Sequence, residues 1–118
     1  MNLQQRIQAI QCAIGKINAA IAQVNAALAN SVDPAEIANL HAQLTDLHAE
    51  LQNLQFQLAH LQAAAGAVGP ISPDAAARVQ QLSGELARLA INGATVTSTL
   101  DFANAVLAKV SEIRQKAG

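Results

Sequence analysis

Residues 3–30 read LQQRIQAIQCAIGKINAAIAQVNAALAN, and this stretch decides the fold. Its large apolar residues recur at alternating steps of four and three positions. They are Leu3, Ile7, Ile10, Ile14, Ile17, Ile21, Val24 and Leu28. A strand gathers side chains at every second position, whereas a helix gathers them at every third or fourth. The spacing therefore predicts one long helix with a heptad seam.

The next segment repeats this pattern after a marked helix start. Asp33 and Pro34 predict that start, because aspartate caps helix N-termini and proline suits the first helical position. Val32 and Ile37 stand where a hydrophobic staple would form. The second seam consists of Ile37, Leu40, Leu44, Leu47, Leu51, Leu54, Leu58, Leu61 and Ala65. We therefore predict a long antiparallel helical hairpin, about residues 2–30 and 34–65, since so short a connection leaves no other arrangement.

The two edges of the hairpin seam differ in chemistry. The expected pairing places Asn18 opposite His48 and Asn25 opposite His41, so one edge is neutral and hydrogen-bonding. The other edge is lined by alanines, which let a third helix come close: Ala13, Ala20 and Ala27. We expect the rest of the chain to dock on this alanine edge.

The remaining chain predicts a third helical segment over residues 73–116. Ser72 and Pro73 mark its start. Asn92-Gly93 is a turn dipeptide followed by poor helix formers, which favours a break or sharp kink near 92–97, with Ser98 capping a new helix. The alternative is an unbroken helix, because the heptad phase continues through Val96. The predicted fold is all-α, a three- or four-helix bundle, with residues 1–118 as a single helical-bundle domain.

The composition excludes several classes of protein. The chain has 118 residues, of which 52% are hydrophobic, 13% charged and 2% aromatic, and its formal net charge is −1. Disorder requires lower hydrophobicity or a higher net charge, and nucleic-acid binding usually requires a basic excess. Residues 51–73 carry no charge, but frequent Gln and His residues argue against a membrane span. We expect a cytoplasmic location, and secretion without a cleaved signal is left open.

Charge is unevenly distributed along the chain. No Lys or Arg occurs between residues 17 and 77, whereas five acidic residues do: Asp33, Glu36, Asp46, Glu50 and Asp74. We expect this segment to pair with the basic residues of the third segment, and assembly between molecules is the alternative.

The sequence offers no catalytic or metal-binding pattern. His41 and His48 are seven positions apart, which is about 10 Å along a helix and too far for direct ligation of one metal ion. His60 lies on another face, and Cys12, the only cysteine, has no histidine at a helical spacing that would activate it. We therefore predict a protein that is not an enzyme and that uses no cofactor and no metal.

The outward positions of the hairpin are unusual because they carry small residues, where a solvated helix face normally carries Lys and Glu. The candidate interface consists of Cys12, Ala19, Ala26, Ala42, Ala49, Phe56, Val106 and Ile113. The sequence favours a non-enzymatic helical interaction or structural protein, whose partner is itself or another helical protein. The alternatives are an amphipathic coat on a lipid or polymer surface, and a small secreted or effector-type partner protein.

Overall fold

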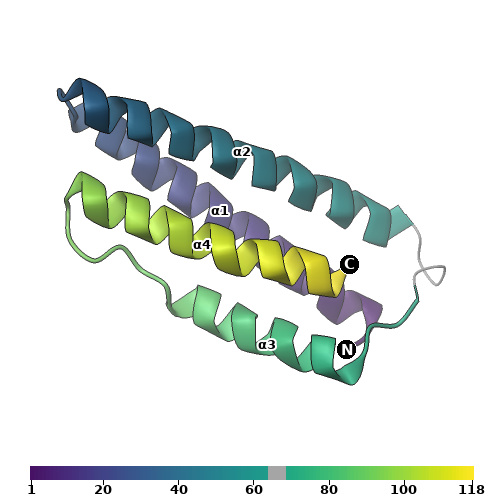
Figure 1. Ribbon diagram of the computed structural model, residues 1–118. Helices are drawn as coiled ribbons and strands as arrows, with labels where there is room; N and C mark the ends of the chain where they lie inside the picture. The colour runs from purple at the N-terminus through teal and green to yellow at the C-terminus, as the bar shows by residue number, and fades with distance from the viewer. Residues whose placement is uncertain (64–68) are drawn as a thin grey trace.

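The computed structural model describes residues 1–63 and 69–118, and these residues form four helices and no strand. They are α1 (Leu3–Asn30), α2 (Pro34–Ala63), α3 (Pro73–Arg88) and α4 (Val96–Ala117) (Figure 1). The prediction of an all-α helical bundle is confirmed. Residues 64 and 65, the predicted end of the second helix, lie outside the described ranges.

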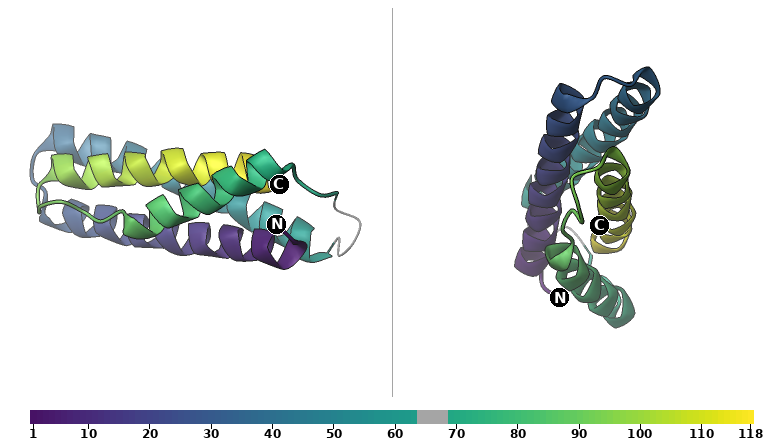
Figure 2. Two further views of the ribbon diagram at one scale, coloured as in Figure 1. Left: turned by 90° about the horizontal axis from the view of Figure 1, so that it is seen from below. Right: turned by 90° about the vertical axis from the view of Figure 1, so that its left-hand side faces the viewer.

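The hairpin forms as predicted, and α4 lies along it. Helices α1 and α2 run side by side in opposite directions, and α4 contacts both of them (Figures 1 and 2). Helix α3 contacts α4 and α1 but not α2. The result is an elongated molecule with principal extents of 51 × 24 × 15 Å.

Helix α4 packs on the alanine edge, which confirms the docking prediction. Ala13 and Ala20 are fully buried. The residues of α2 on the same edge bond directly to α4: Glu50 accepts from the guanidinium of Arg114, and Gln57 donates to the Arg114 carbonyl. Alanine permits this approach because its methyl group leaves room for the side chains of a neighbouring helix.

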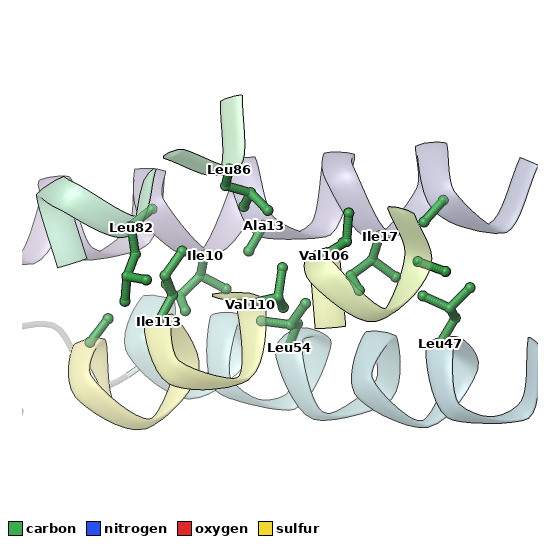
Figure 3. Packing of buried hydrophobic residues seen from close by; sticks show 14 of the residues in the cluster. Ile10, Ala13, Ile17, Leu47, Leu54, Leu82, Leu86, Val106, Val110 and Ile113 are labelled. Atoms are coloured by element: carbon green, nitrogen blue, oxygen red, sulfur yellow. The ribbon is translucent and has the colours of Figure 1, made fainter. Parts of the chain in front are cut away.

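The core lies between the hairpin and the two later helices. Figure 3 shows side chains of α1, α2, α3 and α4 pointing toward one another, Ile17, Leu47, Leu82 and Val106 among them. Each of these four is at most 1% exposed. Burial of this kind contributes about 1.5–3 kcal/mol per large aliphatic side chain, so packing rather than helix propensity holds the bundle together.

The third segment is broken, as predicted, and the unbroken-helix alternative is wrong, but the break begins and ends earlier than the predicted interval of 92–97, because α3 ends at Arg88 and α4 begins at Val96. Leu89 ends α3 by adopting an extended conformation, and Gly93, inside the connection, adopts φ +102°, a conformation that glycine tolerates. The predicted cap at Ser98 is also wrong, because the capping residue is Thr95, whose Oγ1 accepts from the Ser98 amide at 3.0 Å. Because of this break, α4 runs back along α3, and the apolar face of α4 is buried in the core of its own chain.

The helix starts are capped by hydrogen bonds to side chains, but the predicted hydrophobic staple is absent. Asn2 and Gln5 form a capping box at α1, and Ser72 accepts from the Ala75 amide at α3. Asp33 accepts from the Ala35 amide at 2.9 Å, as predicted for α2. The predicted hydrophobic staple does not form, since Val32 is 92% exposed and so cannot pack against Ile37.

Candidate interaction face

The seam of the hairpin splits into two sets of residues with different burial. Alternate seam residues are completely buried: Ile10, Ile17, Val24, Leu40, Leu47, Leu54 and Leu61. The residues between them are only half-buried, and we call them the half-buried stripe: Ile7, Ile14, Ile21, Leu28, Ile37, Leu44, Leu51 and Leu58. The alternation has no lapse in either helix between Ile7 and Leu61.

This split follows from the position of α4. Because α4 occupies the alanine edge, it covers the side of the seam nearest to Ala13 and Ala20. Helix α3 extends that cover over part of α1 only. None of the helices packs on the opposite side of the hairpin, where the stripe lies. The stripe is therefore buried by α1 and α2 against each other and by nothing else among residues 1–63 and 69–118.

Uncharged polar residues flank the stripe on both helices. They are the neutral-edge residues Gln4, Gln11, Asn18, Asn25, His41, His48, Gln55 and Gln62, and all are exposed. The next positions outward are exposed as well: Gln8, Gly15, Ala22, Ala29, Ala38, Thr45, Gln52 and Ala59. The half-buried stripe and these two sets together form what we call the amide face.

The amide face carries no Asp, Glu, Lys or Arg. The charged residues of α1 and α2 are Arg6, Lys16, Glu36, Asp46 and Glu50, and all occupy other heptad positions. Arg6 and Glu50 are buried against α4, and Lys16 donates to the Leu89 carbonyl at 2.6 Å. An exposed face two helices wide without a formal charge is unusual for a helix surface in water, which normally carries Lys and Glu.

Part of the amide face is hollowed. A shallow depression of about 650 Å³ runs along α2 and is lined by His41, Leu44, Thr45, His48, Ala49, Leu51, Gln52 and Gln55. Its floor is the half-buried Leu44 and Leu51, and its rim is formed by histidine and amide side chains. Such an apolar floor with a neutral polar rim suits a side chain or helix of another molecule better than it suits an ion.

The predicted interface residues do not form one patch. Three of them, Cys12, Ala19 and Ala26, are exposed on the flank of α1 that points away from α2. Ala42, Ala49 and Phe56 are exposed on the opposite flank, that of α2, where Phe56 is 75% exposed. Only the Ala49 part reaches the depression.

Val106 and Ile113 do not belong to an interface with another chain, and their assignment there is wrong. Both side chains are fully buried in the core of the bundle. They would be exposed only if α3 and α4 formed one overhanging helix. The break between Arg88 and Val96 returns α4 to its own chain, where both side chains are buried.

The described residues contain no site for metal-assisted or nucleophilic chemistry. No group of three or more His, Cys, Asp and Glu side chains gathers within residues 1–63 or 69–118. Cys12 is an exposed free cysteine, and His41 and His48 lie on the amide face. A further open groove, about 680 Å³, lies at the hairpin tip beside the α3–α4 connection, with Asp33 and Glu36 in its lining.

The outer surface of α3 and α4 is charged, and four of its charged side chains form ion pairs. Arg78 forms a bidentate ion pair with Glu112, and Lys109 donates to Glu85 at 2.9 Å. The hydrogen bond from Arg78 lowers the pKa of Glu112, and that from Lys109 lowers the pKa of Glu85. Glu112 in turn raises the pKa of Arg78. The expected attraction of the basic third segment to α2 is confirmed only for Arg114, which pairs with Glu50.

Arg6 ties one end of the bundle together. Its guanidinium is 3% exposed and donates to the carbonyls of Gly69, Ala117 and Gly118 at 2.7–2.8 Å. A buried arginine requires such partners, and carbonyls at the C-terminal end of α4 supply a favourable negative potential. The amphipathic pattern gave no sign of this contact, because Arg6 sits beside the seam where a small residue is expected.

One described helix, α1, is long and apolar enough to cross a membrane by length and composition alone. Core helices and signal sequences near an N-terminus meet the same criterion, so this finding alone is weak evidence for a membrane span.

Comparison of the chain with family models, with curated proteins and with solved structures finds no match. The amide face is therefore interpreted from its own chemistry.

Proposed function

We propose that this chain is a non-enzymatic helical interaction protein that acts through the amide face. The observation that carries the proposal is the half-buried stripe, a row of isoleucine and leucine side chains left half-covered along both arms of the hairpin. Partial exposure of aliphatic side chains in one continuous row is typical of a surface that another molecule covers.

The polar part of the amide face supports a helical partner. Asn and Gln side chains both donate and accept hydrogen bonds. They recur every seven positions along α1, whereas the equivalent positions of α2 hold two histidines and then two glutamines. A helix laid into the hairpin groove would meet the stripe with its own apolar residues and the amides with its polar ones. The absence of charge on the face excludes electrostatic steering as its main mode of recognition.

Charge insertion tests this proposal. The double variant Asn18→Glu/Gln52→Glu places carboxylates on the amide face at two exposed positions. Its matched control, Gln80→Glu/Asn104→Glu, makes the same chemical changes at exposed positions of α3 and α4. Helix formation tolerates glutamate at all four sites.

We expect the tagged wild-type chain and the control to co-purify the same polypeptide, either the untagged chain or another protein, when expressed together with candidate partners. The amide-face variant should lose that polypeptide while its circular dichroism stays helical. Equal retention by both variants would contradict the proposal.

A lipid surface is the second candidate, and the apolar character of α1 favours it. In that case α1 and α2 would present the half-buried stripe to the membrane. Interfacial helices usually carry Lys and Arg on their polar side, and the amide face has none. Co-sedimentation with phosphatidylcholine vesicles separates the candidates: binding that the amide-face variant loses supports the lipid surface, whereas no binding leaves the protein partner.

A further inference from the structure

We propose that the partner of the amide face is a second copy of this chain, which docks through its own amide face. The inference rests on the proposed function and names its partner. In a two-fold dimer each patch meets the same patch, so the surface must be complementary to itself. Three properties of the amide face meet that requirement.

The first property is the chemistry of its polar residues. A row of carboxylates or ammonium groups repels a copy of itself, whereas a row of amides can donate to and accept from its copy. Gln11, Asn18, Asn25 and Gln55 are exposed amides of this kind. His41 and His48 add groups that, when neutral, carry one donor and one acceptor each.

The second property is the contrast with the rest of the molecule. The outer surface of α3 and α4 is charged and carries the ion pairs Arg78–Glu112 and Lys109–Glu85. Docking the amide face there would remove water from charges without offering them partners. Within the described chain, the surface that matches an uncharged apolar stripe with amide borders is the amide face itself.

The third property is size. The face is two helices wide, about 20 Å, and extends over about 40 Å of α1 and α2. It therefore offers roughly 800 Å² per subunit, which is the contribution of each partner to a stable interface of standard size. A dimer of this kind would bring the two half-buried stripes together as the centre of a larger helical bundle.

Gly15 is a separate observation that points the same way. It lies in the middle of α1 on the amide face, and a methyl group built on it meets no atom within 4 Å. Glycine in a helix interior costs about 1 kcal/mol relative to alanine, and no contact inside this molecule requires it. Gly84 of α3 has the same open surroundings, but Gly15 is the one that leaves space on the amide face for the backbone of a second copy.

Sedimentation equilibrium of the purified chain tests the proposal at concentrations from about 1 to about 300 µM. We expect the apparent mass to rise from the 12.2 kDa of one chain toward twice that value. The Asn18→Glu/Gln52→Glu variant should raise the dissociation constant at least about tenfold, because it carries carboxylates into a desolvated interface. The control Gln80→Glu/Asn104→Glu should change it less than about twofold.

The salt dependence provides an independent readout. Since no charge lies on the amide face, the dissociation constant should stay nearly constant between low and high salt. A steep salt dependence, or equal weakening by both double variants, would show that the copies meet elsewhere and would overturn the inference. A wild-type chain that stays monomeric over the whole series would also overturn it. The proposed function fails separately, if a protein captured by the wild type is captured equally by the amide-face variant.

Discussion

The hairpin and the α3–α4 pair are two antiparallel helix pairs that meet water in opposite ways. Across α3 and α4, long charged side chains join the helices at the surface, as Arg78 does with Glu112. Across α1 and α2, the corresponding outer side holds aliphatic side chains bordered by amides. In the first arrangement the charged side chains are solvated, and four of them form ion pairs. The hairpin side has no charged side chains over its aliphatic residues. This contrast between the two helix pairs is the reason to look for a partner at the hairpin.

The largest expected effect separates the two halves of the hairpin seam. Leu47→Ala removes a fully buried side chain and should lower the free energy of unfolding by about 3 kcal/mol, whereas Leu44→Ala removes a half-buried one and should cost about 1 kcal/mol. Urea denaturation at low protein concentration measures both. Equal losses would mean that the amide face is covered within the monomer, which would break the comparison.

The buried ion pair gives the next largest effect. Arg114→Met leaves the Glu50 carboxylate, whose side chain is 10% exposed, without its cation and should cost about 2 kcal/mol. Arg78→Met makes the same change at the α3–α4 surface and should cost less than Arg114→Met, because solvent screens the exposed pair. Thermal unfolding of the two variants checks this difference. A larger loss for Arg78→Met would show that the surface pairs, and not the contact with α2, anchor α4.

Much of this architecture follows from the sequence, and the omissions have definite causes. The regular spacing of Ile and Leu predicts both hairpin arms, and the small side chains of Ala13 and Ala20 predict where α4 docks. The turn at Asn92-Gly93 predicts the break, but the choice of cap between Thr95 and Ser98 depends on local geometry that composition does not encode. Val106 and Ile113 were misassigned because an apolar helix face looks the same whether its own chain or another covers it.

The amide face itself was only partly predictable. Its neutral edge follows from the pairing of Asn18 with His48, but the half-burial of the stripe depends on where α4 lies. The spacing of the isoleucines alone does not predict which of them a third helix will bury. The interface that the sequence predicts therefore lies one heptad position away from the amide face, on the outer flanks of the two helices.

Two glycine substitutions sharpen the comparison at a smaller energy scale. Gly15→Ala and Gly84→Ala each add a methyl group that meets nothing within 4 Å, so each should stabilise the fold by about 0.5–1 kcal/mol. Only Gly15 lies on the amide face, so only Gly15→Ala should also weaken self-association. Denaturation and sedimentation of both variants test this, and a Gly84→Ala variant that associates less well would contradict it.

The smallest effect concerns pH. The pKa values of Glu85 and Glu112 are lowered by Lys109 and Arg78, so their pairs contribute stability at pH values above the ordinary carboxyl value of 4.5 and lose it as pH falls through the lowered values. The double variant Glu85→Gln/Glu112→Gln should therefore lose less stability than the wild type between pH 6 and about pH 3. Parallel acid titrations would reveal a difference, and identical curves would show that these pairs do not act on folding.

The Arg6 contact implies that the molecule opens from one end. Its guanidinium joins the start of α1 to the end of α4 and to the segment before α3 through three hydrogen bonds to backbone carbonyls. The opposite end of the bundle consists of the hairpin tip, with its exposed Val32, and the loop around Gly93. Arg6 makes no contact there. Backbone amides near residues 26–40 should thus exchange with deuterium sooner than those near residues 6–13, because the end of the bundle that holds Arg6 stays closed while the end with the hairpin tip opens.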